Sequence, residues 1–314
     1  MTGPAATAPT SASKAPAKRP QRPRELQDAL NFHLYHPLAW QLARLLARTP
    51  ITPNMVSVIG GGFVVAAAVA YAQDWYPAAA ALGMLLHMTW HVVDGADGDL
   101  ARMTGRSSPI GEMVDGACDY LSHIVLYLVL GTLLSREIGA AGWWWMLAAG
   151  LSHIVQSNHV EVQRRQYQWW VYGTPWIRLT HEAEGSATRK SVLGGLVSAY
   201  LQLATGLTPH ALRIDAAVDA AKNDPARLEV IRNVVRAEAP PLLRICKILG
   251  PNPRAIVLGI AMIASGVVGG MTGKGPLWYF LYQSILLNVL LVWSVTAHNA
   301  AAKRIAAKIE ALDA

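Results

Sequence analysis

The sequence predicts an all-α integral membrane protein with six transmembrane helices. Of its 314 residues, 53% are hydrophobic and only 15% are charged, whereas soluble domains carry about 25% charged residues. Six apolar stretches approach the roughly 20 residues that a helix needs to cross a bilayer. Their expected ranges are 51–72, 76–93, 110–134, 140–160, 255–271 and 277–298.

An N-terminal region of two parts precedes these stretches. Residues 1–24 are rich in Ala, Pro, Ser and basic residues without an apolar core, which predicts a disordered basic tail and no signal peptide. Residues 25–48 carry leucines at steps of four and then three, which predicts an amphipathic helix on the membrane surface. Packing of that helix on the ends of the other segments explains the pattern equally well. Pro37 must break or kink it.

The distribution of Lys and Arg predicts the topology. Basic residues gather in the N-terminal region, in the loops after the second and fourth stretches and at the C-terminus, and the other turns hold few. By the positive-inside rule, both termini and the loop after the second stretch are cytoplasmic, in a bacterial-type inner membrane. We therefore expect a catalytic membrane domain at 49–165, and spans five and six with a basic C-terminus at 255–314.

Residues 166–254 separate the fourth and fifth stretches and are rich in charge, which predicts a partly helical cytoplasmic insertion. Its apolar run at 192–207 is short for a membrane span, so a helix that lies on the surface or packs there is favoured. Just before the insertion, Arg164 and Arg165 stand beside Tyr and Trp residues. They either bind an acceptor phosphate or lipid head group, or anchor the helix end at an aromatic belt.

Charge and cysteine content exclude several classes of function. The formal net charge is +7, but the sequence contains no recognisable nucleic-acid-binding module, so no nucleic-acid partner is expected. The two cysteines, Cys118 and Cys246, have no partners at metal-binding spacing. They are expected to be reduced thiols that pack as small apolar residues, with no disulfide and no zinc site.

Acidic residues gather between the second and third stretches, in the sequence DGADGDLARMTGRSSPIGEMVDGACD at 94–119. Asp94 and Asp97 share one helix face, and Asp115 and Asp119 lie one turn apart on the next helix. Two antiparallel helices joined by a turn at 105–109 bring the four carboxylates together. Such a cluster needs cations, and oxygen ligands favour Mg²⁺ or Mn²⁺. Two-metal sites of this kind serve phosphoryl transfer.

Two further acids, Asp99 and Glu112, fall off the shared face and are expected to be solvated or to lie behind the metal ligands. A purely structural interpretation pairs the acids with Arg102 and Arg106. Six negative charges against two arginines at the end of a membrane span make that arrangement unfavourable. Arg102 is instead placed to contact a phosphate.

These residues resemble the signature D-x2-D-G-x2-A-R-x8-G-x3-D-x3-D of the CDP-alcohol phosphotransferase family. Every fixed position is present, supplied in order by Asp94, Asp97, Gly98, Ala101, Arg102, Gly111, Asp115 and Asp119. The resemblance extends to Thr52-Pro53-Asn54, to the six-span layout and to about residues 30–165. Segment 166–254 does not match the short connection usual in the family, which leaves the acceptor open.

The resemblance implies a transferase of phospholipid biosynthesis. It would move a substituted phosphate from a CDP-linked alcohol, with CDP-diacylglycerol as the expected lipid donor, to a second alcohol and release CMP. Asp94, Asp97 and Asp115 would hold two divalent metal ions, and Asp119 would complete the metal site and act as general base. The nucleotide and its phosphates would be held by Asn54, Gly98, Ala101, Arg102, Arg106 and Gly111. The resemblance also allows a homodimer.

Two alternative functions agree less well with the sequence. An intramembrane prenyltransferase also uses Asp-rich helices on a diphosphate, but it does not call for Ala101, Arg102 and Gly111 at these gaps. A transporter would spread its acids over several spans and show internal repeats, whereas here the acids cluster in two consecutive segments. The nearby histidines His87, His91 and His123 are expected to pack or to donate hydrogen bonds rather than to bind metal.

Overall fold

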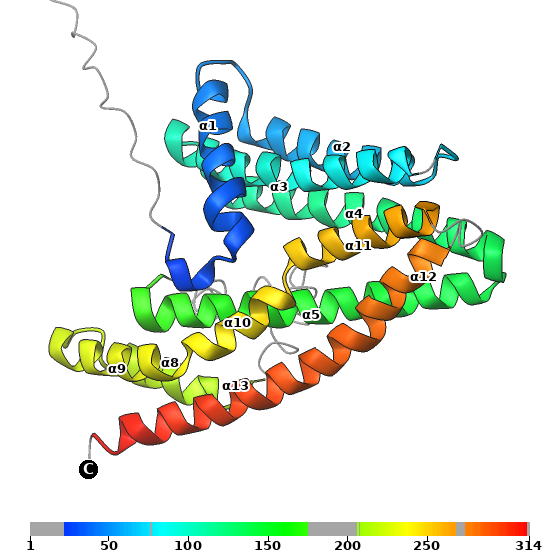
Figure 1. Ribbon diagram of the computed structural model, residues 1–314. Helices are drawn as coiled ribbons and strands as arrows, with labels where there is room; N and C mark the ends of the chain where they lie inside the picture. The colour runs from blue at the N-terminus through cyan, green and yellow to red at the C-terminus, as the bar shows by residue number, and fades with distance from the viewer. Residues whose placement is uncertain (1–21, 76, 175–205, 207, 268–273, 313–314) are drawn as a thin grey trace, which may run out of the picture.

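All regular structure that the computed structural model describes is helical, as the sequence predicts (Figure 1). The description covers residues 22–75, 77–174, 206, 208–267 and 274–312. No strand occurs within these ranges. The apolar run expected at 192–207 lies outside them except for Gly206.

The helices within the described residues have the following bounds. In chain order they are η1 (Arg24–Leu26), η2 (Asn31–Tyr35), α1 (His36–Leu46), α2 (Pro53–Tyr71), α3 (Ala78–Thr104), α4 (Pro109–Ile138), α5 (Ala141–Tyr172), α8 (Ala211–Ala220), α9 (Pro225–Glu238), α10 (Pro240–Ile248), α11 (Pro251–Val267), α12 (Lys274–Leu281), η4 (Tyr282–Leu286) and α13 (Leu287–Glu310). In Figure 1, α2, α3 and α4 run alongside one another, and α1 crosses them near one end.

Local signals in the sequence account for where the principal helices begin and end. Thr52 and Ser108 cap α2 and α4 with side-chain oxygens that accept backbone N–H groups, and each is followed by a proline in the first turn. The helices α3, α4 and α5 each end at a glycine with positive φ: Gly105, Gly139 and Gly173. These caps set the lengths of the helices that carry the acidic residues.

Within the part of the chain that the structure describes, four helical segments are long and apolar enough to cross a membrane. They are Pro53–Tyr71, Ile110–Ile138, Pro240–Ser265 and Lys274–Glu310. The other two expected spans, 76–93 and 140–160, fall on α3 and α5 and are not among these four. Polar side chains such as His87 and Asp94 in α3, and His153 and Gln156 in α5, account for the difference.

The N-terminal helix packs on the protein more closely than its leucine pattern indicates. The small residues Ala39 and Ala43 are fully buried, and α1 makes extensive contact with α3. Leu38 and Leu45 point outward and are 41% and 63% exposed. Pro37 does not break the helix: it lies in the first turn of α1, directly after the π-helical turn η2, so the expectation of a break was wrong.

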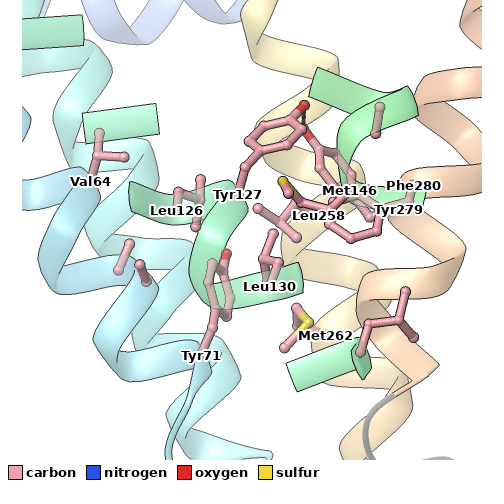
Figure 2. Packing of buried hydrophobic residues seen from close by; sticks show 14 of the residues in the cluster. Val64, Tyr71, Leu126, Tyr127, Leu130, Met146, Leu258, Met262, Tyr279 and Phe280 are labelled. Atoms are coloured by element: carbon pink, nitrogen blue, oxygen red, sulfur yellow. Dashed lines mark hydrogen bonds between the residues drawn. The ribbon is translucent and has the colours of Figure 1, made fainter. Parts of the chain in front are cut away.

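The main core lies between α2, α3, α4, α5, α11 and α12 (Figure 2). Its centre contains the fully buried side chains of Tyr71, Leu130 and Phe280. Small residues let the helix backbones approach closely, as is common where lipid surrounds helices. At Gly142, for example, an added Cβ would lie 2.6 Å from the backbone nitrogen of Ser135. Close packing of α4 and α5 therefore depends on this glycine.

A second core joins the end of α5 to α8, α9 and the end of α13. Tyr167 and Trp170 are buried in it, and Trp170 Nε1 donates a hydrogen bond to Asp215 Oδ1 at 2.7 Å. Because they pack inside the protein, Tyr167 and Trp170 do not supply the aromatic belt that one of the two interpretations of Arg164 and Arg165 invokes. The helix α5 continues to Tyr172, so the domain boundary expected at 165/166 falls inside a helix, because this second core stabilises the helical extension.

Candidate active site at the start of α4 and the end of α3

The helices α3 and α4 form an antiparallel hairpin around a tight turn. Gly105 adopts φ 66°, a conformation that favours glycine, and ends α3. The backbone N–H of Arg106 bonds to the carbonyl of Ala101 at 2.9 Å, and Ser108 then begins α4. This geometry confirms the expected turn at 105–109 and brings acidic residues that are far apart along the helices into one site.

Three of the expected metal ligands meet in this hairpin. Asp94, Asp97 and Asp115 each offer a carboxylate oxygen, and these oxygens lie within 4.8 Å of one another. Asp97 is 6% exposed and accepts a hydrogen bond from Ser57 Oγ of α2 at 2.6 Å. Sequence reasoning did not single out Ser57, because one serine in an apolar helix carries no distinctive spacing.

The fourth aspartate, Asp119, lies beside this group on α4. It interacts electrostatically with Asp94 and Asp115. Its Oδ1 accepts a hydrogen bond from Trp90 Nε1 of α3 at 3.0 Å. Its backbone carbonyl lies 2.8 Å from His123 Nδ1. Asp119 is thus held from both helices of the hairpin, with Trp90 as a contact that the sequence did not reveal.

Asp99 is not solvated but forms a buried ion-pair group. It is 2% exposed, and its Oδ1 pairs with Arg22 at 2.9 Å and with Arg102 at 2.5 Å. A carboxylate buried to this extent requires positive partners, which is why the N-terminal segment folds back to α3. Of the two expected alternatives for Asp99, solvation was therefore wrong, whereas Glu112 is exposed.

The residues expected to hold the nucleotide line the same hairpin and the start of α2. A Cβ added at Gly111 would lie 3.5 Å from Asn54 Oδ1, and one at Gly98 would lie 3.4 Å from Arg102 Nη1. Ala101 is half-buried and Arg106 is exposed. Five of the six thus lie on the hairpin, and the sixth, Asn54, is close to Gly111 from the start of α2. The five are Gly98, Ala101, Arg102, Arg106 and Gly111.

The histidines near the site pack among aromatic rings. Tyr35 stacks on His91 with ring centroids 5.0 Å apart. The Trp90 ring packs against those of His91 and His123, with centroid distances of 4.5 and 4.7 Å. None of these histidines belongs to the described group of aspartates. Their contacts are those of packing residues, in line with the expectation.

Arg164 and Arg165 both pair with Glu161 on their own helix, at 2.8 and 2.5 Å. Each arginine side chain is still more than 40% exposed. The pairs satisfy part of their charge without an outside anion, so the contacts do not choose between phosphate binding and anchoring.

Arg254, at the start of α11, is a candidate site residue that sequence reasoning missed. It is 3% exposed and donates only to neutral groups among the described residues: Ser157 Oγ at 2.7 Å and Gln156 Oε1 at 3.2 Å. Its Nε has no partner there, and its charge acts on His123. A buried guanidinium without a carboxylate partner is a candidate for contact with an anionic ligand. In the sequence, Arg254 is one basic residue at a helix start, without distinctive spacing.

The aspartate group suits a divalent metal ion. Its donors are all carboxylate oxygens, the chemistry that Mg²⁺ and Mn²⁺ prefer. Asp115 Oδ1 is buried and has no hydrogen-bond partner in the described structure, so a cation would supply the contact that this oxygen lacks. The residues present therefore fit the metal site that the sequence predicts.

Comparison with known proteins assigns the region that contains this hairpin. Residues 50–176 match the profile of the CDP-alcohol phosphatidyltransferase family. These residues are a CDP-alcohol phosphatidyltransferase domain. The transferase domain includes α2, α3, α4 and α5, and with them all four aspartates.

The transferase domain is similar to parts of several curated proteins. An uncharacterized class-I family protein of Schizosaccharomyces pombe is 29% identical over 35% of this chain and 30% of its own length. Cholinephosphotransferase 1 of Xenopus laevis is 34% identical over 23% of this chain and 17% of its own length. A putative cardiolipin synthase of Mycobacterium bovis is 34% identical over 32% of this chain and 44% of its own length. The chain thus spans less than half the length of each of these relatives.

Proposed function

We propose that the protein is a Mg²⁺-dependent CDP-alcohol phosphotransferase. It moves a substituted phosphate from a CDP-linked donor, with CDP-diacylglycerol as the lipid donor, to an acceptor alcohol and releases CMP. The observation that carries the proposal is the group of three carboxylate oxygens within 4.8 Å, with Asp119 beside them, inside a transferase domain. A prenyltransferase or a transporter offers no reason for that domain match.

The proposed mechanism divides the four aspartates into two roles. Two Mg²⁺ ions (or Mn²⁺) bound by Asp94, Asp97 and Asp115, with Asp119 completing the site, would neutralise the diphosphate of the donor. Asp119 takes the proton of the acceptor hydroxyl, and that oxygen forms a bond to the phosphorus of the transferred phosphate. The bond from this phosphorus to the bridging oxygen breaks, and CMP leaves with the electron pair.

The nucleotide side of the site is proposed to lie over Gly98 and Gly111. Glycine at these positions leaves room for a ligand next to the backbone. Asn54 and Arg106 would contact the cytidine or its phosphates. Because Arg102 pairs with Asp99, its guanidinium is oriented before the donor binds, which lowers the entropic cost of a phosphate contact.

The acceptor is proposed to be an alcohol that carries an anionic group, such as a phosphate. Support comes from Arg254, whose buried guanidinium lacks a carboxylate partner among the described residues. It acts electrostatically on His123, which contacts the backbone of Asp119. An anion at Arg254 would therefore place a hydroxyl on the same side as the proposed base.

The proposed setting is a bacterial-type inner membrane, with six spans, both termini and the site on the cytoplasmic side, and a homodimer as the assembly. Four sufficiently apolar helices support a membrane protein, and the distribution of Lys and Arg supports the orientation. In this setting a water-soluble nucleotide and a membrane-bound lipid both reach the aspartates.

The decisive experiment is CMP release by the purified full-length protein in detergent with CDP-diacylglycerol, Mg²⁺ and a panel of acceptors. Glycerol phosphate and inositol phosphate are compared with glycerol, inositol, serine and choline, and mass spectrometry identifies the lipid product. CMP release with an anionic acceptor is expected. Asp119→Asn should lower kcat by about 10²–10⁴-fold, whereas Glu112→Gln, which removes an exposed acid of the same helix, should match the parent.

Two outcomes would contradict parts of the proposal. The reaction class would be refuted if no CDP-alcohol yields CMP and Asp119→Asn behaves like the parent protein. CMP release only with neutral or cationic acceptors would refute the assignment of Arg254. For an anionic acceptor, Arg254→Gln should raise KM about tenfold or more, since hydrogen bonds to charged groups contribute about 1.5–3 kcal/mol. Arg254→Lys, which keeps the charge, should recover part of the loss.

A further inference from the structure

A second group of potential metal ligands lies outside the aspartate site. His159, Cys246 and His298 come from α5, α10 and α13, three helices that pack against one another. Their side chains are buried, with 1%, 6% and 7% exposure. One ligand atom from each lies within 4.8 Å of the other two. The sequence does not reveal this group, because its members are far apart in the chain.

The pair Cys246 and His298 has the geometry of two ligands on one tetrahedral ion. Cys246 Sγ lies 3.7 Å from His298 Nε2. Typical zinc distances to sulfur and nitrogen place two such ligands about 3.6 Å apart. His298 Nδ1 lies 2.8 Å from the backbone carbonyl of Ser294, so Nδ1 donates its proton there and Nε2 keeps its lone pair. Metal-bound histidines are commonly oriented by such an outer hydrogen bond.

His159 supplies the second observation. Its Nε2 lies 2.9 Å from Ser294 Oγ, but Nδ1 is buried without a hydrogen-bond partner in the described structure. A ring nitrogen buried in this way loses its contact with water and gains nothing in return. Coordination of a cation by this imidazole would give the ring a second polar partner, next to a thiol and another imidazole.

We propose that His159, Cys246 and His298 form a structural zinc site. Mixed thiolate and imidazole donors select Zn²⁺ over Mg²⁺, which prefers the oxygen donors of the aspartate group. Three protein ligands leave one tetrahedral position for water or for the hydroxyl of Ser294, which is fully buried. The ion would connect α5, α10 and α13. It would thereby hold the end of α10, which directly precedes the helix that carries Arg254.

Metal analysis of the purified full-length protein tests the site. After dialysis against buffer with excess Mg²⁺, the parent should retain about one zinc per chain, and Cys246→Ser and His298→Gln should retain none. Cys118→Ser is the matched control, because it removes the only other cysteine, and it should retain the zinc. Substitution with Co²⁺ should produce a thiolate-to-metal charge-transfer band in the parent and in Cys118→Ser that Cys246→Ser lacks.

A second measurement avoids variants that fail to fold. In Cys118→Ser the only thiol is Cys246, and zinc should slow its alkylation at least tenfold, whereas a zinc-selective chelator in excess Mg²⁺ should restore the faster rate. Equal alkylation rates with and without zinc would overturn the proposal and leave a hydrogen-bonded network of His159, Ser294 and His298. Retention of the charge-transfer band in a folded Cys246→Ser protein would overturn it as well.

Discussion

Trp90 Nε1 donates a hydrogen bond to Asp119 Oδ1 at 3.0 Å, from α3 to α4 across the hairpin. The indole also packs against His91 and His123, with ring centroids 4.5 and 4.7 Å away, so its N–H direction is set by packing. Under the proposed function, Trp90 is a positioning residue for the general base. This contact leads to the first prediction.

Trp90→Phe keeps an aromatic ring but removes the donor to Asp119. A hydrogen bond to a charged group contributes about 1.5–3 kcal/mol, so we expect kcat for CMP release to fall about tenfold or more. KM for both substrates should change little, because the indole N–H contacts the carboxylate rather than a substrate. Trp144→Phe, at a side chain that is 71% exposed, is the control. Equal kcat values for the two variants would rule out a positioning role.

Ser57→Ala removes the hydroxyl that donates to Asp97 Oδ2 at 2.6 Å. Loss of an outer hydrogen bond to a metal ligand typically weakens metal affinity 10–100-fold, so the Mg²⁺ concentration for half-maximal CMP release should rise by about this factor. Thr132→Ala removes a hydroxyl that bonds only within its own helix, to Leu128 O, and should leave Mg²⁺ activation unchanged. An unchanged Mg²⁺ titration for Ser57→Ala would show that Asp97 needs no such support.

Gly142→Ala places a methyl group 2.6 Å from the backbone nitrogen of Ser135. Backbone cannot move aside as a flexible side chain does, and overpacking of this kind costs about 1–3 kcal/mol. We expect a lower midpoint for thermal loss of the monodisperse protein in detergent. At Gly62 an added Cβ meets nothing within 4 Å, so Gly62→Ala should be neutral or slightly stabilising. A similar midpoint for both variants would contradict the close approach of α4 and α5.

The attachment of the N-terminal segment to α5 should depend on pH. Burial acts to raise the pKa of Glu25, but hydrogen bonds from the hydroxyl groups of Tyr172 and Tyr167 outweigh it and lower this pKa below the ordinary 4.5. The ionised Glu25 carboxylate therefore contributes fully to the stability of the folded protein above pH 4.5. This contribution is lost as pH falls through the lowered pKa.

Thermal unfolding over a pH series tests this linkage. The stability difference between the parent and Glu25→Gln should be present at neutral pH and should shrink as pH falls below 4.5. Tyr172→Phe should reduce the difference, because it removes one of the two donors. If the stability difference between the parent and Glu25→Gln grows toward low pH instead, the pKa of Glu25 is raised in the folded protein and the prediction is wrong.

Local signals made much of the catalytic hairpin predictable. The caps Thr52 and Ser108, the turn at Gly105 and the spacing of the aspartates are all short-range features, and the structure agrees with them. The helical class followed from composition and apolar length. These features depend on residues within a few turns of one another, so pattern alone is sufficient to find them.

Contacts between distant segments could not be predicted. The ion pair of Arg22 with Asp99 spans 77 residues, and the hydrogen bond of Trp170 with Asp215 spans 45. Periodicity says which side of a helix is apolar, but not which helix covers it, so the burial of Tyr167 and Trp170 could not be predicted. The same limitation concealed Ser57, Trp90 and Arg254, each a single residue whose meaning depends on a neighbour from another helix.

The hairpin of α3 and α4 carries all four aspartates on one uninterrupted stretch, 94–119, whereas Arg254 enters from α11, at the end of the expected insertion. Donor chemistry and acceptor choice would then be encoded by separable parts of the gene. Recombination downstream of α5 could exchange one acceptor for another while the hairpin stays intact. Chimaeras joined after Tyr172 are accordingly the natural route to redirect this enzyme toward a different lipid product.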